Sequence, residues 1–141
     1  MQKLLVFLIL TSFSYLAFAR PARVILIRHA EKPKHHSPHL SEKGFLRARA
    51  LVKIFDLQPA LASKGLPVMF MASKYEEGSS ANRAVETLTP ISKSLGIPLI
   101  SPYLPKDTEA AADFVLTNPQ FEARTIMIAW KHSAIPKLAK L

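Results

Sequence analysis

The sequence predicts an α/β domain of three layers, in which helices cover both faces of a mostly parallel central sheet. Short apolar runs alternate along the chain with longer stretches of helical periodicity. That alternation is typical of βαβ units, whose strands run parallel and are buried on both faces. The first and last apolar runs each end beside a basic residue and a histidine. Such strand ends are where open α/β sheets bind ligands.

The chain of 141 residues is long enough for one domain but not comfortably for two. Residues 1–19 are predicted to be a cleaved secretory signal peptide, leaving a mature domain over residues 20–141. Lys3 supplies the positive start, Leu4–Leu10 begin the apolar segment, and Ala17–Ala19 fit a small-x-small cleavage site. The alternative is an uncleaved anchor. We expect an exported protein, periplasmic or secreted, without stable membrane insertion after cleavage.

The first half of the domain reads as strand, loop, helix and strand. Val24–Ile27 has the length and composition of a buried strand, and Pro67–Ala72 is the second strand, after a turn at Gly65. Between them, Ser41 is a residue type that caps helix N-termini. The helix after this cap is expected to bury one apolar face, made of Leu46, Ala50, Leu51, Ile54 and Phe55.

The second half continues the alternation of helices and strands. A long helix is expected after Ser79 and Ser80, ending at Gly96, because its apolar residues form a single stripe. That stripe consists of Ala84, Val85, Leu88, Ile91 and Leu95. The remaining elements are a strand over Pro98–Tyr103, weakened by Pro102, a helix over Thr108–Thr117, a strand over Thr125–Trp130 and a helix from Ile135.

Composition narrows the function classes. The formal charge is +9, and removal of residues 1–19 deletes Lys3 and no acid, which leaves +9 − 1 = +8. Lysines and arginines are dispersed rather than clustered, so a specific nucleic-acid partner is not predicted, whereas anionic ligands in general are favoured. The chain has no cysteine, which excludes disulfides, thiolate catalysis and sulfur-ligated zinc.

Four basic side chains in these contexts point to phosphoryl transfer. Arg28 and His29 end the first strand, Arg83 opens the long helix, and His132 follows the last strand. An imidazole can attack phosphorus, and guanidinium groups bind phosphate oxygens through a planar fork of donors. Taken singly, Arg28 and His29 could cap a strand and face solvent, and Arg83 could be an ordinary exposed helix arginine. His132 could be a satisfied structural histidine, so the prediction depends on the set.

Four segments, taken in order, carry a family resemblance. The stretches RHAEKP, LSEKGFLRARAL, SSANRAVETLTPISKSLG and IMIAWKHSAIP resemble the histidine phosphatase superfamily, also called phosphoglycerate mutase-like. The resemblance implies that His29 is a transiently phosphorylated nucleophile and that Arg28, Arg83 and His132 line the phosphate pocket. It further implies hydrolysis of a small phosphomonoester or phosphoanhydride, with no cofactor and no metal.

A phosphatase also needs a carboxylic acid to protonate the leaving oxygen. The family commonly supplies this acid from a loop after the third strand, where the chain has Asp107 and Glu109. We place Glu109 slightly ahead of Asp107, and Glu31, beside the nucleophile motif, is a third candidate. Asp107 as a helix cap and Glu109 as an ordinary first-turn charge are the structural alternatives.

Other polar residues are open to two interpretations. Glu86 lies three residues after Arg83, so it either orients Arg83 or forms a plain surface ion pair. His35, His36 and His39 are irregularly spaced in a loop with prolines, which favours a solvated loop over a metal site.

The short segment after His132 leads to a second functional hypothesis. Only nine residues follow His132 in the 141-residue chain. Members of the family generally continue through another helix and strand, so it stays open whether this domain has them. The alternative function is therefore a catalytically weak or inactive exported member that binds phosphate or other anions. Substrate identity and oligomeric state are not predicted.

Overall fold

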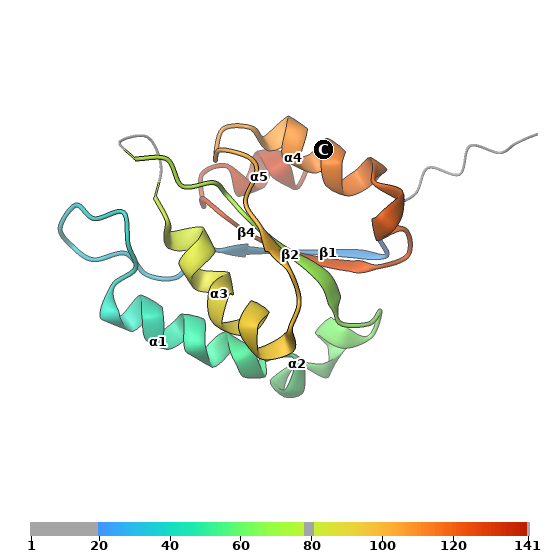
Figure 1. Ribbon diagram of the computed structural model, residues 1–141, viewed down its shortest axis with the longest axis horizontal. Helices are drawn as coiled ribbons and strands as arrows, with labels where there is room; N and C mark the ends of the chain where they lie inside the picture. Colours follow the sequence, from blue (N-terminus) through green and yellow to red (C-terminus); the bar gives the residue numbers. More distant parts are fainter. Residues whose placement is uncertain (1–19, 78–80, 141) are drawn as a thin grey trace, which may run out of the picture.

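A computed structural model describes residues 20–77 and 81–140. Its centre is a four-stranded sheet in the order β1-β4-β2-β3, and every neighbouring pair is parallel (Figure 1). The predicted signal peptide and the predicted helix-capping pair Ser79 and Ser80 lie outside the described residues. The strands are β1 (Arg23–Arg28), β2 (Pro67–Ala72), β3 (Leu99–Ile100) and β4 (Thr125–Trp130).

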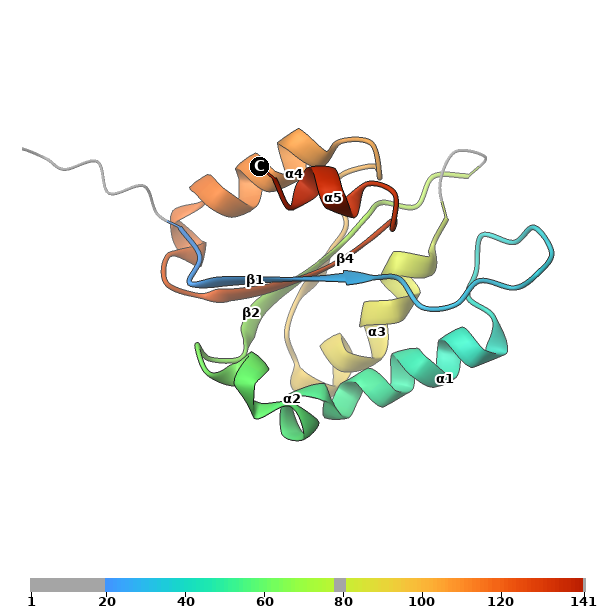
Figure 2. The same ribbon diagram turned by 180° about the vertical axis from the view of Figure 1, so that it is seen from behind.

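Helices cover both faces of this sheet, so the predicted three-layer α/β/α fold is confirmed (Figures 1 and 2). One face carries α1 (Glu42–Ala50), α2 (Ile54–Leu57) and α3 (Arg83–Leu95), whereas the other carries α4 (Thr108–Thr117) and α5 (Ile135–Leu138). Short 3-10 turns occupy Leu51–Lys53, Pro59–Ala62 and Pro119–Phe121.

The two central strands, β2 and β4, supply both hydrophobic cores because successive side chains of a strand point to opposite faces. Met71 and Ile128 pack under α4 and α5, whereas Phe70 and Met127 pack under α3. All four side chains are at most 1% exposed. Continuous burial of this kind explains why both strands read as unbroken apolar runs in the sequence.

The third strand is shorter than expected. Pro98–Tyr103 was the predicted range, but only Leu99 and Ile100 pair with β2. Pro102 has no backbone N–H to continue the ladder, and the chain turns away after Ile100. The segment after β3 nevertheless stays beside the segment after β2. The N–H of Lys74 donates to the carbonyl of Tyr103 at 2.6 Å.

The predicted apolar face of the helix after Ser41 is wrong in its first turns. Leu46 is 56% exposed, and the buried residues of α1 are Gly44 and Ala48. The helix breaks at the 3-10 turn after Ala50, which changes the phase of the periodicity. Glycine is required at position 44 because a Cβ atom there would collide with the carbonyl oxygen of Glu31.

Within residues 20–77 and 81–140, no helix has the length and apolar character that crossing a membrane requires.

Candidate active site

The candidate residues gather at one edge of the sheet, where the carboxyl ends of the parallel strands lie. His29 follows β1 and His132 follows β4, and these strands are direct neighbours. The backbone N–H of His29 donates to the carbonyl of Trp130 at 3.2 Å, which extends that pairing by one bond. Arg83 is the first residue of α3, which begins at the same edge after β2.

The imidazole of His29 is held in one tautomer. Its Nδ1 lies 2.7 Å from the carbonyl oxygen of Ala30. A carbonyl only accepts, so Nδ1 carries the proton and donates. In the neutral ring the lone pair is therefore on Nε2, which is the atom available to attack an electrophile.

The surroundings of His29 lower its pKa below the usual 6.5. Burial is the largest cause, because it disfavours the charged ring. The hydrogen bond to Ala30 opposes this, and the positive charges of Arg83, Arg28 and His132 lower the pKa further. The charges of Arg83, Arg28 and His132 thus all act on His29, and the lowered pKa favours the neutral imidazole at pH 7.

The cations differ in exposure. Arg83 is partly buried and its Nη1 donates to the carbonyl of Ser37 at 3.2 Å. Its Nε is buried and has no hydrogen-bond partner among the described residues. Arg28 and His132 are exposed. The site is therefore a cationic surface with a partly buried side and an open side, suited to an anion that arrives from solvent.

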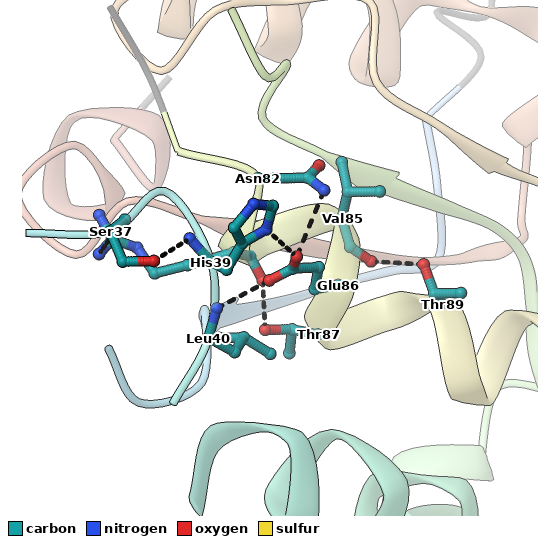
Figure 3. A network of polar contacts seen from close by, with 9 residues as sticks. Ser37, His39, Leu40, Asn82, Val85, Glu86, Thr87 and Thr89 are labelled. Carbon is teal, nitrogen blue, oxygen red and sulfur yellow. Dashed lines mark hydrogen bonds and ion pairs between the residues drawn. The ribbon is translucent and has the colours of Figure 1, made fainter. Parts of the chain in front are cut away.

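The loop that joins β1 to α1 (residues 29–41, the β1–α1 loop) is fixed to α3 by Glu86 (Figure 3). Its carboxylate accepts from Nδ1 of His39 at 2.6 Å, from the backbone N–H of Leu40 at 2.8 Å and from Nδ2 of Asn82 at 3.4 Å. Glu86 was expected either to orient Arg83 or to form a plain surface ion pair, and neither interpretation included the bonds to His39 and Leu40 of this loop.

Thr87 is a buried polar residue next to the site that the sequence analysis did not identify. It is 1% exposed, and its hydroxyl oxygen accepts from the backbone N–H of Ala30 at 2.9 Å. The same hydroxyl donates to the carbonyl of Arg83 at 2.6 Å. The available signal was its spacing of three residues from Ala84 and four from Ile91, which places it on the buried side of α3.

The three carboxylates proposed as proton donors have other partners. Glu31 forms an ion pair with Arg47 at 2.7 Å. Asp107 accepts from the backbone N–H of Leu104 at 3.1 Å, and it does not cap α4 with its side chain.

Glu109 forms an ion pair with Lys137 at 3.0 Å, and the two side chains are 73% and 59% exposed. Both Asp107 and Glu109 lie at the start of α4, on the edge that carries His29. Two glutamates that the sequence analysis did not consider, Glu76 and Glu77, follow β2 at this edge and are exposed.

The histidines of the β1–α1 loop are not assembled into a metal site. Across residues 20–77 and 81–140, no group of three or more histidine, aspartate or glutamate side chains is placed to hold a metal ion. His39 is bound to Glu86, and His35 and His36 are exposed.

No protein-family model matches the chain, and no curated protein matches it in sequence. A solved structure does match it in fold. That structure is of a protein from Agrobacterium tumefaciens, which is provisionally assigned as the phosphohistidine phosphatase SixA. The TM-score is 0.57 at 18% identity, and the match covers 83% of this chain and 73% of the other. The fold that the sequence resemblance implied is thus found independently in three dimensions, and the chain has the histidine phosphatase fold.

Proposed function

We propose that this protein is a phosphatase that forms a phosphohistidine on His29. The observation that carries the proposal is the setting of that imidazole: Nδ1 is bonded to the Ala30 carbonyl, and burial together with the charges of Arg83, Arg28 and His132 lowers the pKa of the ring, which favours its neutral form. The SixA assignment of a protein with the same fold supports the same chemistry.

The reaction runs in two displacements. Nε2 of His29 attacks phosphorus, a P–N bond forms, and the bond between phosphorus and the leaving oxygen breaks. Water then attacks phosphorus, a P–O bond forms and the P–N bond breaks, which releases inorganic phosphate and restores the neutral imidazole. The carboxylate that protonated the leaving oxygen in the first step takes the proton of the water. Arg28, Arg83 and His132 bind the non-bridging oxygens, on which negative charge is spread in both transition states.

Glu109 is the first candidate for the group that protonates the leaving oxygen, and Asp107 is the second. Glu109 is on the first turn of α4, at the edge that carries His29. Its ion pair with Lys137 is exposed, and exposed ion pairs hold their side chains weakly, so the carboxylate is free to exchange partners.

The substrate class is a small phosphomonoester or phosphoanhydride, and the SixA assignment adds phosphohistidine as a further candidate. We propose that the mature protein is residues 20–141, exported after removal of a signal peptide. A non-catalytic anion-binding role is the second candidate, favoured by one observation: Asp107 and Glu109 both have other partners in this structure.

The first test is turnover of a chromogenic aryl phosphate by the full chain. The second is rapid quenching of the full chain with labelled substrate, in acid and in alkali, to detect a labelled phosphoenzyme. We expect hydrolysis and a phosphoenzyme that is stable to alkali and lost in acid. His29→Asn abolishes both, whereas the matched change His36→Asn, in the same loop and exposed, leaves both unchanged. Persistent turnover in His29→Asn contradicts the proposal. Binding of vanadate without any turnover by the wild type selects the anion-binding role.

The proton donor is tested with two leaving groups. Aryl phosphates leave readily without an acid, whereas alkyl phosphates require one. We therefore expect Glu109→Gln to slow alkyl ester hydrolysis far more than aryl ester hydrolysis. Selective loss in Asp107→Asn instead transfers the role to Asp107.

A further inference from the structure

The peptide group that follows His29 is bound to α3 through a single buried hydroxyl. The N–H of Ala30 donates to Oγ1 of Thr87 at 2.9 Å, and both residues are 1% exposed. The carbonyl of the same residue accepts from Nδ1 of His29 at 2.7 Å. Ala30 therefore connects the orientation of the imidazole to one side chain of the helix.

The direction of these bonds is fixed by the donor inventory. A threonine hydroxyl has one proton, and Thr87 gives it to the carbonyl of Arg83 at 2.6 Å. Its lone pair must then face the N–H of Ala30. The result is a continuous series of hydrogen bonds from Ala30 through Thr87 to the backbone of Arg83.

A bond from a threonine to the carbonyl four residues earlier is common in helices and does not by itself indicate a role. Thr89 forms it with Val85 at 2.8 Å and Thr117 forms it with Asp113 at 2.8 Å. Thr87 differs from these two because it is buried and because its oxygen also accepts a bond from a distant segment. Figure 3 shows Thr87 and Thr89 on the same helix, which makes Thr89 a matched control.

We propose that Thr87 is a positioning residue for the phosphohistidine reaction, which sets the distance and orientation between the His29 imidazole and the Arg83 guanidinium. This inference rests on the proposed function. A nucleophile and a phosphate-binding group from different elements must share one frame of reference, because small displacements of reacting groups reduce rates strongly. The Thr87 hydroxyl fixes the residue that follows His29 to the first turn of α3, which begins with Arg83.

The test compares Thr87→Val, Thr87→Ser and Thr89→Val in the full chain, with aryl phosphate as substrate and inorganic phosphate as inhibitor. Thr87→Val keeps the shape and removes the hydroxyl. We expect its kcat to fall by about 10- to 100-fold, the range that a displacement of up to about 1 Å produces. Because Arg28 and His132 remain, inhibition by inorganic phosphate changes much less than kcat.

Thr87→Ser restores the hydroxyl and with it most of kcat, whereas Thr89→Val behaves as the wild type. A kcat for Thr87→Val equal to that of the wild type overturns the inference, and so does a failure of Thr87→Ser to restore activity when that variant is folded. Thermal unfolding of each variant establishes that the assays compare folded proteins.

Amide hydrogen exchange of the wild type keeps the inference testable where Thr87→Val does not fold and where the wild type shows no turnover. We expect the Ala30 amide to exchange as slowly as the His29 amide, which bonds to Trp130. An Ala30 amide that exchanges as fast as those of the exposed residues His35 and His36 overturns the positioning role. A slow Ala30 amide in a protein without phosphohistidine or turnover supports the contact while overturning the proposed function.

Discussion

The two sides of the candidate site are built differently. On the side of β1 and α3, His29 and Arg83 are partly buried, and buried or half-buried hydrogen bonds to Thr87 and Glu86 fix the intervening loop. On the side of β4 and α4, His132 is exposed, and Glu109 is held by an ion pair whose partners are 73% and 59% exposed.

This difference separates two tasks of the proposed reaction. Attack on phosphorus requires a fixed imidazole beside at least one fixed cation, here Arg83, because that geometry is common to every substrate. Protonation of a leaving group requires only that an acid can reach an oxygen whose position changes with the substrate. The rigid side suits the first task, and the exposed side suits the second.

Among the variants that compare the two sides, the largest effect is expected from removing the partly buried cation. Arg83→Met keeps the length of the side chain but removes its charge and its donors. We expect kcat/KM for an aryl phosphate to fall by about 10²- to 10³-fold, as for the loss of one preorganised donor in other enzymes. The exposed His132→Asn is the comparison, and we expect a smaller loss. Equal losses in the two variants contradict the distinction between the sides.

The same variant changes the pH dependence. The neutral imidazole is the reactive form, so activity falls as pH decreases through the pKa of His29, which lies below 6.5. Burial is the main cause of that low pKa, and Arg83 is the first of the cations that add to it. In Arg83→Met we expect the acid limb to move to higher pH, and NMR titration of His29 measures the shift directly.

An intermediate effect is expected where the β1–α1 loop meets α3. Glu86→Gln keeps one acceptor oxygen, and its amide nitrogen cannot accept a hydrogen bond. At least one of the donors on Leu40, His39 and Asn82 therefore loses its partner. We expect the free energy of unfolding to fall by about 1–3 kcal/mol, because hydrogen bonds to a charged acceptor contribute more than neutral ones. Chemical denaturation measures it, with the exposed Glu122→Gln as the control. A variant as stable as this control shows that the loop is held by other contacts.

The smallest effect is expected on the exposed side. Lys137→Met removes the partner of Glu109, and exposed ion pairs contribute about 0–1 kcal/mol. We expect unfolding to change by no more than this and aryl phosphate hydrolysis to be unaffected. A loss of more than about 1 kcal/mol would mean that the α4 side is as firmly fixed as the α3 side.

Much of the fold could be predicted from local patterns. Pro67–Ala72 and Thr125–Trp130 were predicted with the observed bounds because both are buried on two faces, and Thr108–Thr117 was predicted as observed. The end of α3 at Gly96 was also predicted, because glycine commonly ends helices in a left-handed conformation. The observed φ of Gly96 is 64°.

The contacts that hold the site were not predictable in the same way. Thr87 and Glu86 bind backbone groups of residues far away in sequence, and no periodicity shows which N–H group a side chain will meet. The burial of Gly44 and Ala48 in place of Leu46 has a similar origin. It depends on how closely α1 approaches the β1–α1 loop, which is a property of the assembled fold.

The close approach of Gly44 to Glu31 has one further consequence. The glycine meets main-chain atoms only two residues after His29, so the interface has few rotatable groups that could absorb a strain. A tilt of α1 would therefore press directly on the backbone of Glu31, two residues after His29.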